Sequence, residues 1–317
     1  MGQVLISGHW GGDINPLPAL DLLARGFQSF APTWQAHRAP FGPGRAFVEA
    51  MRSHVDIAVL STAEEADLKV LGARYRAAIL AGQSPVVEGG HLAHTDGGVA
   101  FLEGLSGLSR ADYSDFDHWF FSAIEQSRLL CRRSDFYAAF SSARPLFGPS
   151  STLALNPDLT PRNDTDADFN RQWMSLLHQI AQPYLPLQGQ PASVVEPGRI
   201  AGSGASGGAA AVISVLGGRL ISDGDFLAYQ TNLHSRLAEV DLVIVLEPEL
   251  HSPVLAESTL PTLTEAAARL ALPVLAIGRS SSLSAHERAE WGIHGVLTDE
   301  NEDFETLGQR AARTWAS

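Results

Sequence analysis

The chain has 317 residues, enough for two ordinary domains or one large one, and its 45% hydrophobic and 18% charged residues are typical of a globular protein. A net charge of −13 without a cluster of basic residues makes it a poor binder of nucleic acid, and no apolar run reaches the length of a membrane span. The single cysteine, Cys131, excludes an internal disulfide framework. Because the N-terminus also lacks a basic leader segment, we expect a cytoplasmic protein with no nucleic-acid or membrane partner.

The pattern of the first fifty residues predicts a strand followed by a helix. Residues 3–7 form a short apolar run that ends at Gly8, as a first strand would. The apolar residues that follow share one helical face, and they are Leu17, Leu20, Leu23, Ala24 and Phe27. Asp13 is the expected cap of this helix and Pro32 its end.

The middle of the chain is harder to assign. Residues 56–60, 73–80 and 85–88 are short apolar segments between polar turns, which favours strands. A helix over 64–80 is the alternative, because that window contains no proline. Residues 112–133 form an aromatic amphipathic helix expected to belong to the core, and a further helix is predicted over 169–181.

Residues 89–98 form a glycine-rich loop that contains His91, His94 and Asp96. These three side chains are potential metal ligands, yet the sequence shows no fourth ligand and no second-shell partner. A solvated loop without a metal is therefore the simpler interpretation, and we predict no metal site.

A second glycine-rich stretch precedes a helix in the last third of the chain. It contains Gly202, Gly204, Gly207 and Gly208, and an apolar run over 209–216 follows. Glycine allows close approach of a ligand, and the amides of a helix start favour an anion, which predicts a phosphate-binding loop. Tight packing through small residues is the competing explanation. Buried strands near 239–247 and 272–278 flank a helix over 262–272, which indicates a parallel α/β sheet.

This last third resembles the bacterial glycerate kinase family. That family carries Gly-Ala-Gly-Ala-Ala-Gly-Gly where this chain has residues 202–208, and then a strand that ends in Thr-Gly-Glu-Gly. Glu247 falls on the glutamate of that motif. His251 replaces the family's aspartate, Pro253 its glutamine and Ser258 its lysine.

The N-terminus is similar to the same family, whose first strand leads into Pro-Asp-Ser-Phe-Lys-Gly. Trp10 and Gly12 match the aromatic residue and the last glycine, whereas the aspartate and lysine fall on Gly8 and Gly11. In the next family motif, the aspartate and glutamate fall on Phe41 and Gly44.

Residues 89–98 resemble the family's Gly-Gly-Ser-Ala-Thr-Asn-Asp-Gly-Gly with one residue inserted, which would make Asp96 a retained carboxylate. The matches to an Arg-Tyr strand and a Val-Glu strand set a different register, in which this similarity is fortuitous. We slightly favour the second alignment.

The resemblance implies a doubly wound, Rossmann-like parallel α/β sheet with a second, inserted α+β domain, in two lobes. The expected domains are residues 1–50 with 200–317, and residues 51–199. If the strands near 3–7 and 239–247 are neighbours, His9, Glu247 and His251 would line one cleft.

Two hypotheses about function follow. Loss of most charged motif positions favours a glycerate kinase-like protein with weak or absent phosphotransferase activity and a retained cleft for an organic acid or a nucleotide. The alternative is an active ATP- and Mg²⁺-dependent glycerate or hydroxy-acid kinase with a rebuilt site. A homodimer is a candidate assembly under both hypotheses. The candidate catalytic residues are Glu247, His251 and Asp96. The candidate residues of the substrate cleft are His9, Trp10 and Gly12. The candidate nucleotide-binding residues are Gly202, Ser203, Gly204, Ser206, Gly207 and Gly208.

Overall fold

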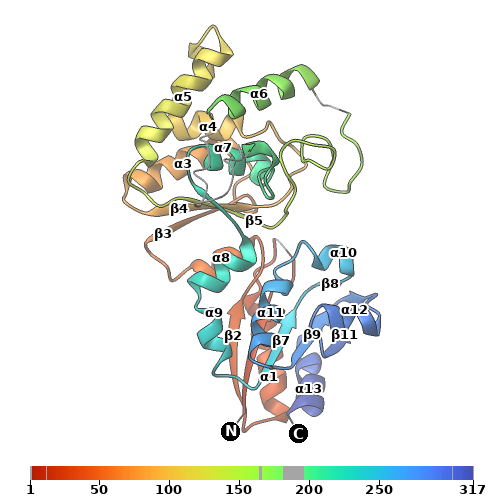
Figure 1. Cartoon of the computed structure of the whole chain (residues 1–317). Coiled ribbons are helices and arrows are strands. Elements are labelled where there is room, and N and C mark those ends of the chain that lie inside the picture. Colours follow the sequence, from red (N-terminus) through yellow and green to blue (C-terminus); the bar gives the residue numbers. More distant parts are fainter. Residues whose placement is uncertain (1, 12, 164–165, 181–195, 302, 317) are drawn as a thin grey trace, which may run out of the picture. The chain divides into compact units, whose positions relative to one another are not determined.

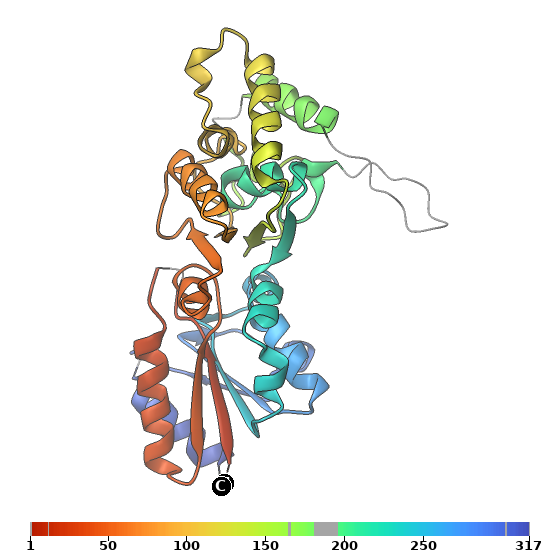
Figure 2. The ribbon, with the colours of Figure 1, turned by 90° about the vertical axis from the view of Figure 1, so that its left-hand side faces the viewer.

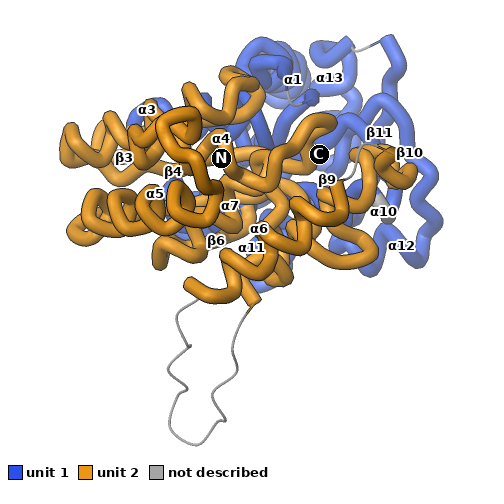
Figure 3. Tube along the Cα trace, turned by 90° about the horizontal axis from the view of Figure 1, so that it is seen from above, with its two compact units in different colours: residues 1–53, 223–317 blue, residues 54–222 orange. Residues whose placement is uncertain are grey.

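The computed structural model describes residues 2–11, 13–163, 166–180, 196–301 and 303–316. The chain forms two compact units (Figure 3): unit 1 comprises residues 1–53 and 223–317, and unit 2 comprises residues 54–222. The sequence had placed residues 200–222 with the first domain. They belong to unit 2, because β6 (Arg219–Ser222) pairs in parallel with β5 (Tyr137–Phe140) of that unit.

Unit 1 is built on a five-stranded sheet in the order β11-β9-β7-β1-β2, and every pair of neighbours is parallel. The strands are β1 (Gln3–Gly8), β2 (Gln35–Pro40), β7 (Leu242–Leu246), β9 (Val274–Gly278) and β11 (Gly295–Thr298). The first strand and the strand near 239–247 are neighbours, which is the condition that the expected cleft required, and Val4 lies opposite Leu242. A smaller parallel pair joins β8 (Glu249–Leu250) to β10 (Ser280–Ser281).

Helices cover both faces of the unit 1 sheet, as a doubly wound fold requires. Figure 2 shows α1 (Leu17–Phe30) and α13 (Phe304–Trp315) on one side of the strands and α8 (Asp223–Gln230) and α9 (Leu233–Leu237) on the other. α11 (Leu260–Arg269) packs against α8 and α9. The remaining helices of this unit are α2 (Arg45–Met51), α10 (Ser252–Leu255) and α12 (Ala285–Glu290).

The first helix begins differently from the prediction. Its N-cap is Pro16, and the carboxylate of Asp13 makes no capping hydrogen bond to it. The Oδ1 atom of Asn15 instead accepts a hydrogen bond from the backbone N–H of Leu17 at 2.9 Å. The predicted end is confirmed, since α1 stops at Phe30, just before Pro32.

α1 and α13 touch backbone to backbone. A Cβ atom added to Gly26 of α1 would lie 2.0 Å from the carbonyl oxygen of Glu305, and one added to Gly308 would lie 2.2 Å from that of Leu23. Each helix therefore presents a glycine to the other, which closes the hydrophobic core formed by these helices and the sheet.

Unit 2 carries a four-stranded sheet in the order β3-β4-β5-β6, again with all neighbours parallel. Its other strands are β3 (Ile57–Ser61) and β4 (Ser84–Gly89), and its helices include α4 (Val99–Ser106), α5 (Phe116–Cys131), α6 (Ala167–Ile180) and α7 (Ala209–Val215) (Figure 1). Short 3₁₀ turns lie at Arg110–Asp112, Pro197–Arg199 and Ser206–Gly208. The α/β class is confirmed, but the second unit is itself a parallel α/β layer and not the predicted α+β arrangement.

The predicted strand over residues 73–80 is wrong. These residues belong to α3 (Leu68–Leu80), the helix that the sequence left as the alternative. Asp67 begins it by accepting hydrogen bonds from the N–H groups of Lys69 and Val70. Its buried residues recur at helical spacing, and this periodicity is stronger evidence for a helix than the short apolar run is for a strand. The buried residues are Leu68, Leu71, Gly72, Tyr75, Ala78 and Ile79.

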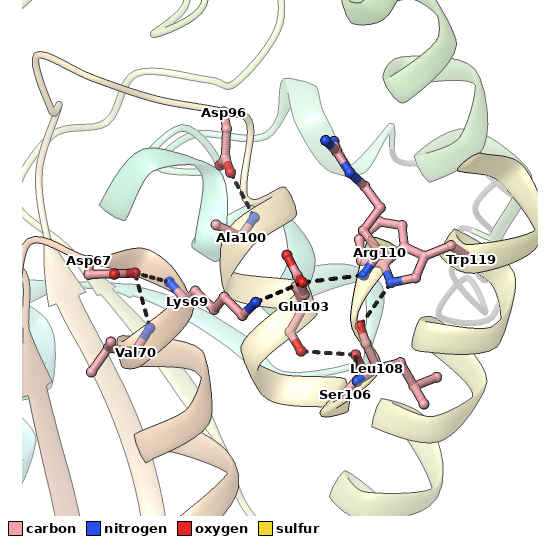
Figure 4. A network of polar contacts seen from close by, with 10 residues as sticks. All are labelled: Asp67, Lys69, Val70, Asp96, Ala100, Glu103, Ser106, Leu108, Arg110 and Trp119. Atoms are coloured by element: carbon pink, nitrogen blue, oxygen red, sulfur yellow. Dashed lines mark hydrogen bonds and ion pairs between the residues drawn. The ribbon is translucent and has the colours of Figure 1, made fainter. Parts of the chain in front are cut away.

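α3 and α4 cross as closely as α1 and α13 do. A Cβ atom on Gly72 would meet the carbonyl oxygen of Phe101 at 2.1 Å, and one on Gly104 would meet that of Lys69 at 2.0 Å. The single lysine of the chain reinforces this crossing (Figure 4), because Nζ of Lys69 lies 2.8 Å from Oε1 of Glu103. The α5 helix packs its predicted aromatic face into the same core, except that Leu129 is 62% exposed.

We predict that Gly26→Ala lowers the stability of unit 1 by about 1–3 kcal/mol, because the added methyl group forces α1 and α13 apart. Urea unfolding would measure the loss. Arg25→Ala, on the exposed side of the same helix, is the matched control and should change stability by no more than about 0.5 kcal/mol. Equal stability of both variants would contradict the close crossing.

Candidate functional site

The strand order of unit 1 reverses between β1 and β7. The chain runs from β1 to β2 on one side and from β7 through β9 to β11 on the other. Open α/β sheets bind ligands outside the carboxyl ends of the strands at such a reversal. Two of the predicted site residues follow these strands directly: His9 comes after β1, and Glu247 comes after β7.

His9 and Glu247 form a buried pair at this point. The Nε2 atom of His9 lies 3.2 Å from Oε1 of Glu247, and the two residues are 6% and 3% exposed. The atoms are at ion-pair distance without forming a well-aligned hydrogen bond. The backbone N–H of Gly11 donates to Nδ1 of His9 at 3.3 Å, so the proton of a neutral imidazole is on Nε2 and faces the carboxylate.

Glycines pack tightly around the pair. A Cβ atom on Gly8 would lie 2.1 Å from the carbonyl oxygen of Leu246, and one on Gly42 would lie 2.6 Å from the imidazole of His9. A Cβ atom on Gly278 would lie 2.8 Å from the carbonyl oxygen of Glu247. The two ionisable side chains are therefore held in place by a shell that has no room for larger residues.

Trp10 and Arg279 extend the site along the sheet edge. Trp10 is 1% exposed, and its indole packs edge-on against Phe304. The guanidinium of Arg279 lies over the indole at 4.9 Å and donates from Nη2 to the carbonyl oxygen of Trp10 at 3.0 Å. Sequence reasoning missed Arg279, although its place directly after the strand over 272–278 was a usable signal. Gly12, the third predicted substrate residue, lies outside the described residues.

His251 occupies a different environment. Its Nδ1 atom lies 2.6 Å from the hydroxyl of Ser282, and its Nε2 atom lies 3.4 Å from that of Ser280. Among the residues that the structure describes, His251 has no polar contact with His9 or Glu247. Of the three side chains expected to lie together, His9 and Glu247 are in contact. His251 instead hydrogen-bonds to the serines that follow β9.

Glu287 hydrogen-bonds to two serines near His251 in the sequence or in the fold, Ser252 and Ser284. Its carboxylate accepts hydrogen bonds from the hydroxyl of Ser252 and the backbone N–H of Ser284. The pKa of Glu287 is lowered from 4.5 to about 2, first by the backbone of Ser284 and then by the hydroxyls of Ser284 and Ser252. The carboxylate is therefore ionised wherever the protein is folded near neutral pH.

The predicted phosphate loop lies in unit 2, where its backbone is already hydrogen-bonded. The amides of Gly202, Ser203, Gly204, Ala205, Ser206 and Gly208 donate to carbonyl oxygens within the unit. The hydroxyl of Ser203 donates to the carbonyl oxygen of Ile200, while that of Ser206 is buried and has no hydrogen-bond partner. The helix behind the loop, α7, has only seven residues, so it gives little support to an anion.

The loop glycines serve packing. A Cβ atom on Gly202 would lie 2.3 Å from the ring of Phe140, and one on Gly204 would lie 2.4 Å from Oγ1 of Thr152. Gly208, at φ +95°, would meet Gly97 of the other glycine-rich loop at 2.3 Å. These contacts favour the packing explanation of the motif over the nucleotide-binding one.

The two glycine-rich loops therefore meet. Ser206 donates its N–H to the carbonyl oxygen of Gly90, and the hydroxyl of Thr95 donates to that of Gly207. Just before α4, the carboxylate of Asp96 accepts hydrogen bonds from the N–H groups of Gly98 and Ala100, and Figure 4 shows the second of these. Burial raises the pKa of the Asp96 carboxyl.

Asp96 also lines a pocket of about 270 Å³ in unit 2, together with Thr95, Leu153, Arg162, Asp166, Phe169 and Asn170. Burial and the nearby Arg144 and Arg162 lower the pKa of His91, and His94 is exposed. The described part of the chain contains no group of three or more His, Cys, Asp or Glu side chains that could hold a metal ion. It also contains no helix with the length and apolarity needed to cross a membrane.

Comparison with known proteins places these features in a family. A model of the glycerate kinase family matches residues 123–315. Two uncharacterised proteins, one from Mycobacterium bovis and one from Mycobacterium tuberculosis, are each 27% identical to the chain over 238 residues, 75% of its length. The chain spans 56% of the length of these relatives.

The fold is also that of a solved structure. The crystal structure of a candidate glycerate kinase 2 from Salmonella typhimurium LT2 matches the chain with a TM-score of 0.71 and 18% sequence identity. The match covers 100% of this chain and 98% of that one. At this identity the likeness establishes a shared fold across both units.

We predict that His9→Phe lowers stability by about 3–5 kcal/mol, since it leaves the buried carboxylate of Glu247 without its partner. The double variant His9→Phe with Glu247→Leu should recover part of this loss, because it removes the stranded charge. A double-mutant cycle by urea unfolding measures the coupling. Simple addition of the two single effects would show that the side chains do not interact.

We also predict a pH-dependent contribution from Glu287. Because its folded pKa is below its unfolded value, ionisation stabilises the folded state above about pH 4.5, and this stabilisation disappears as the pH falls toward 2. The urea midpoint of the wild type should exceed that of Glu287→Gln at pH 6, and the difference should shrink at pH 3. A difference that is constant with pH would refute the assignment.

Proposed function

The chain belongs to the glycerate kinase family, and we propose that it is a ligand-binding member of that family with weak or absent phosphotransferase activity. Its ligand is a small organic acid or a nucleotide. The ligand-binding position is the carboxyl edge of the unit 1 sheet, at His9, Trp10 and Glu247.

One observation carries this proposal: in the glycine loop over 202–208, the amides of residues 202–206 and of Gly208 are hydrogen-bonded within the protein. A loop that cradles phosphates must direct such amides at the ligand. Here three of them donate to carbonyl oxygens within residues 200–208, and the others donate to those of Ala143, Arg144 and Gly90. We therefore derive no catalytic step through ATP or Mg²⁺ at this position.

The distribution of positive charge supports the same conclusion. Phosphoryl transfer depends on cations that neutralise the transferring group, and in this family's motifs lysines stand at the positions of Gly11 and Ser258. The chain's one lysine, Lys69, pairs with Glu103 across the α3–α4 crossing. Removing such electrostatic partners costs orders of magnitude in rate each.

A second function is favoured by the His9–Glu247 pair. A carboxylate that lies against a buried imidazole, at the carboxyl ends of adjacent strands, is suited to accept a proton from a substrate hydroxyl. An active ATP-dependent glycerate or hydroxy-acid kinase with a rebuilt site is therefore the alternative. In that case Glu247, oriented by His9, is the carboxylate that accepts the proton of the substrate hydroxyl.

We also propose that the chain forms a homodimer through the outer face of α5. On the outer face of α5, Phe121 and Leu129 are 41% and 62% exposed, and a second copy of the chain would bury them.

The deciding measurement is the melting temperature with D-glycerate, with Mg²⁺-ATP, and with both. A ligand at a hundred times its Kd stabilises the native state by about 2.7 kcal/mol, which corresponds to a rise of several degrees. We expect a rise with the acid or the nucleotide but no ADP formation above background in a coupled assay.

Two outcomes would contradict this proposal. No rise with either ligand at millimolar concentration removes the binding function. D-glycerate-dependent ADP formation that is lost in Glu247→Gln, and kept in the control Glu249→Gln, establishes the kinase instead. Glu249 is the matched control because it is an exposed carboxylate two positions along the chain.

A further inference from the structure

We propose that Ser282 is a nucleophilic serine activated by His251, and that its hydroxyl takes the acyl group of activated carboxylic esters. This activity goes beyond the proposed function, because it uses neither the His9–Glu247 pair nor a ligand bound beside that pair. The reaction takes place at the surface of unit 1, since Ser282 is exposed and an ester reaches it directly from solvent.

The small parallel sheet of unit 1 brings the two residues together. β8 and β10 pair with Leu250 opposite Ser281, and the next residues along the two strands are His251 and Ser282. The N–H of Ser282 donates to the carbonyl oxygen of Leu250 at 3.1 Å, so the pairing continues past the strand ends. The backbone therefore places the imidazole beside the hydroxyl.

The imidazole contacts a hydroxyl group on each side. Nδ1 of His251 lies 2.6 Å from Oγ of Ser282, and Nε2 lies 3.4 Å from Oγ of Ser280. Hydroxyl donors make shorter hydrogen bonds than N–H donors do, so in the 2.6 Å contact the hydroxyl of Ser282 donates to an unprotonated Nδ1. The proton of the neutral ring is then on Nε2, which donates it to Ser280. This tautomer makes His251 the base for Ser282 and Ser280 a positioning residue.

The arrangement supports an acyl transfer to the serine. Oγ of Ser282 attacks the carbonyl carbon of the ester while the hydroxyl proton passes to Nδ1 of His251. The bond between that carbon and the alkoxy oxygen then breaks, and the imidazolium gives the proton to the leaving group. The products are an acyl-serine and a free alcohol or phenol.

The backbone around Ser282 limits the reaction to activated esters. Its own amide donates to the carbonyl oxygen of Leu250, and the amide of Ser284 donates to the carboxylate of Glu287. These two amides are therefore not directed at the oxyanion that forms during attack, and one such donor contributes about a hundredfold to a thousandfold in rate. The ester must compensate with a leaving group that is stable as an anion, such as a phenolate.

The test follows acetylation of the whole chain by p-nitrophenyl acetate. Release of p-nitrophenolate gives the rate, and mass spectrometry of peptides identifies the acetylated residue. The variants are Ser282→Ala, His251→Gln, Ser280→Ala and Ser280→Thr. Ser281→Ala is the matched control, because Ser281 is an exposed serine of the same stretch whose hydroxyl accepts the N–H of Leu283.

We expect acetylation of Ser282 in the wild type and in Ser281→Ala, and background release of p-nitrophenolate in Ser282→Ala. His251→Gln should lower the acetylation rate of Ser282 by about a hundredfold, within the range that a general base contributes. Ser280→Ala should lower this rate several-fold, and Ser280→Thr should restore it, because threonine keeps the hydroxyl that accepts the Nε2 proton.

Two results would overturn the proposal: an acetyl group on Ser280 or Ser281 in place of Ser282, or an unchanged rate at Ser282 in His251→Gln. If His251→Gln does not fold, the wild type decides alone. Equal acetylation rates of Ser281 and Ser282 then overturn the proposal, and faster acetylation of Ser282 supports it. None of these measurements uses D-glycerate or ATP, so they leave the proposed ligand-binding function to its own test.

Discussion

Close contact between backbones at glycine residues determines how both units are assembled. In unit 1 the α1–α13 pair crosses at Gly26 and Gly308, and in unit 2 the α3–α4 pair crosses at Gly72 and Gly104. Dispersion forces fall steeply with separation, so helices that approach to backbone contact hold their layer at a fixed distance from the sheet. The strand ends, and the side chains that follow them, are therefore also held in fixed positions.

The same constraint gives the glycine-rich loop a structural explanation. Phe140, Thr152 and Gly97 approach the loop so closely that larger residues at Gly202, Gly204 and Gly208 would collide with them. A motif can therefore be retained for packing after the charged residues around it have changed. In unit 1, by contrast, glycines enclose an ionisable pair, and there the close packing orients His9 against Glu247.

Much of the fold was predictable from the sequence, because buried strands and amphipathic helices have local signatures. The strands β1, β3, β4, β7 and β9 follow from short apolar runs. Residues 73–80 were misassigned because the cap that starts their helix, Asp67, lies upstream of the apolar segment. At the site, His9 and Glu247 were predictable once β1 and β7 were taken as neighbours. The partners of Arg279 and His251 were not, since they depend on how residues after β9 turn, which no local pattern encodes.

The discontinuity of unit 1 has a consequence for the order in which the protein is made. β1 lies between β2 and β7 in the sheet, yet β7 leaves the ribosome only after all of unit 2. Unit 2 is continuous in sequence and can fold while synthesis proceeds, whereas one side of β1 stays without a partner until β7 arrives. The nascent chain thus exposes an apolar strand edge for the time needed to translate the insertion, and this is the interval in which a chaperone is most needed.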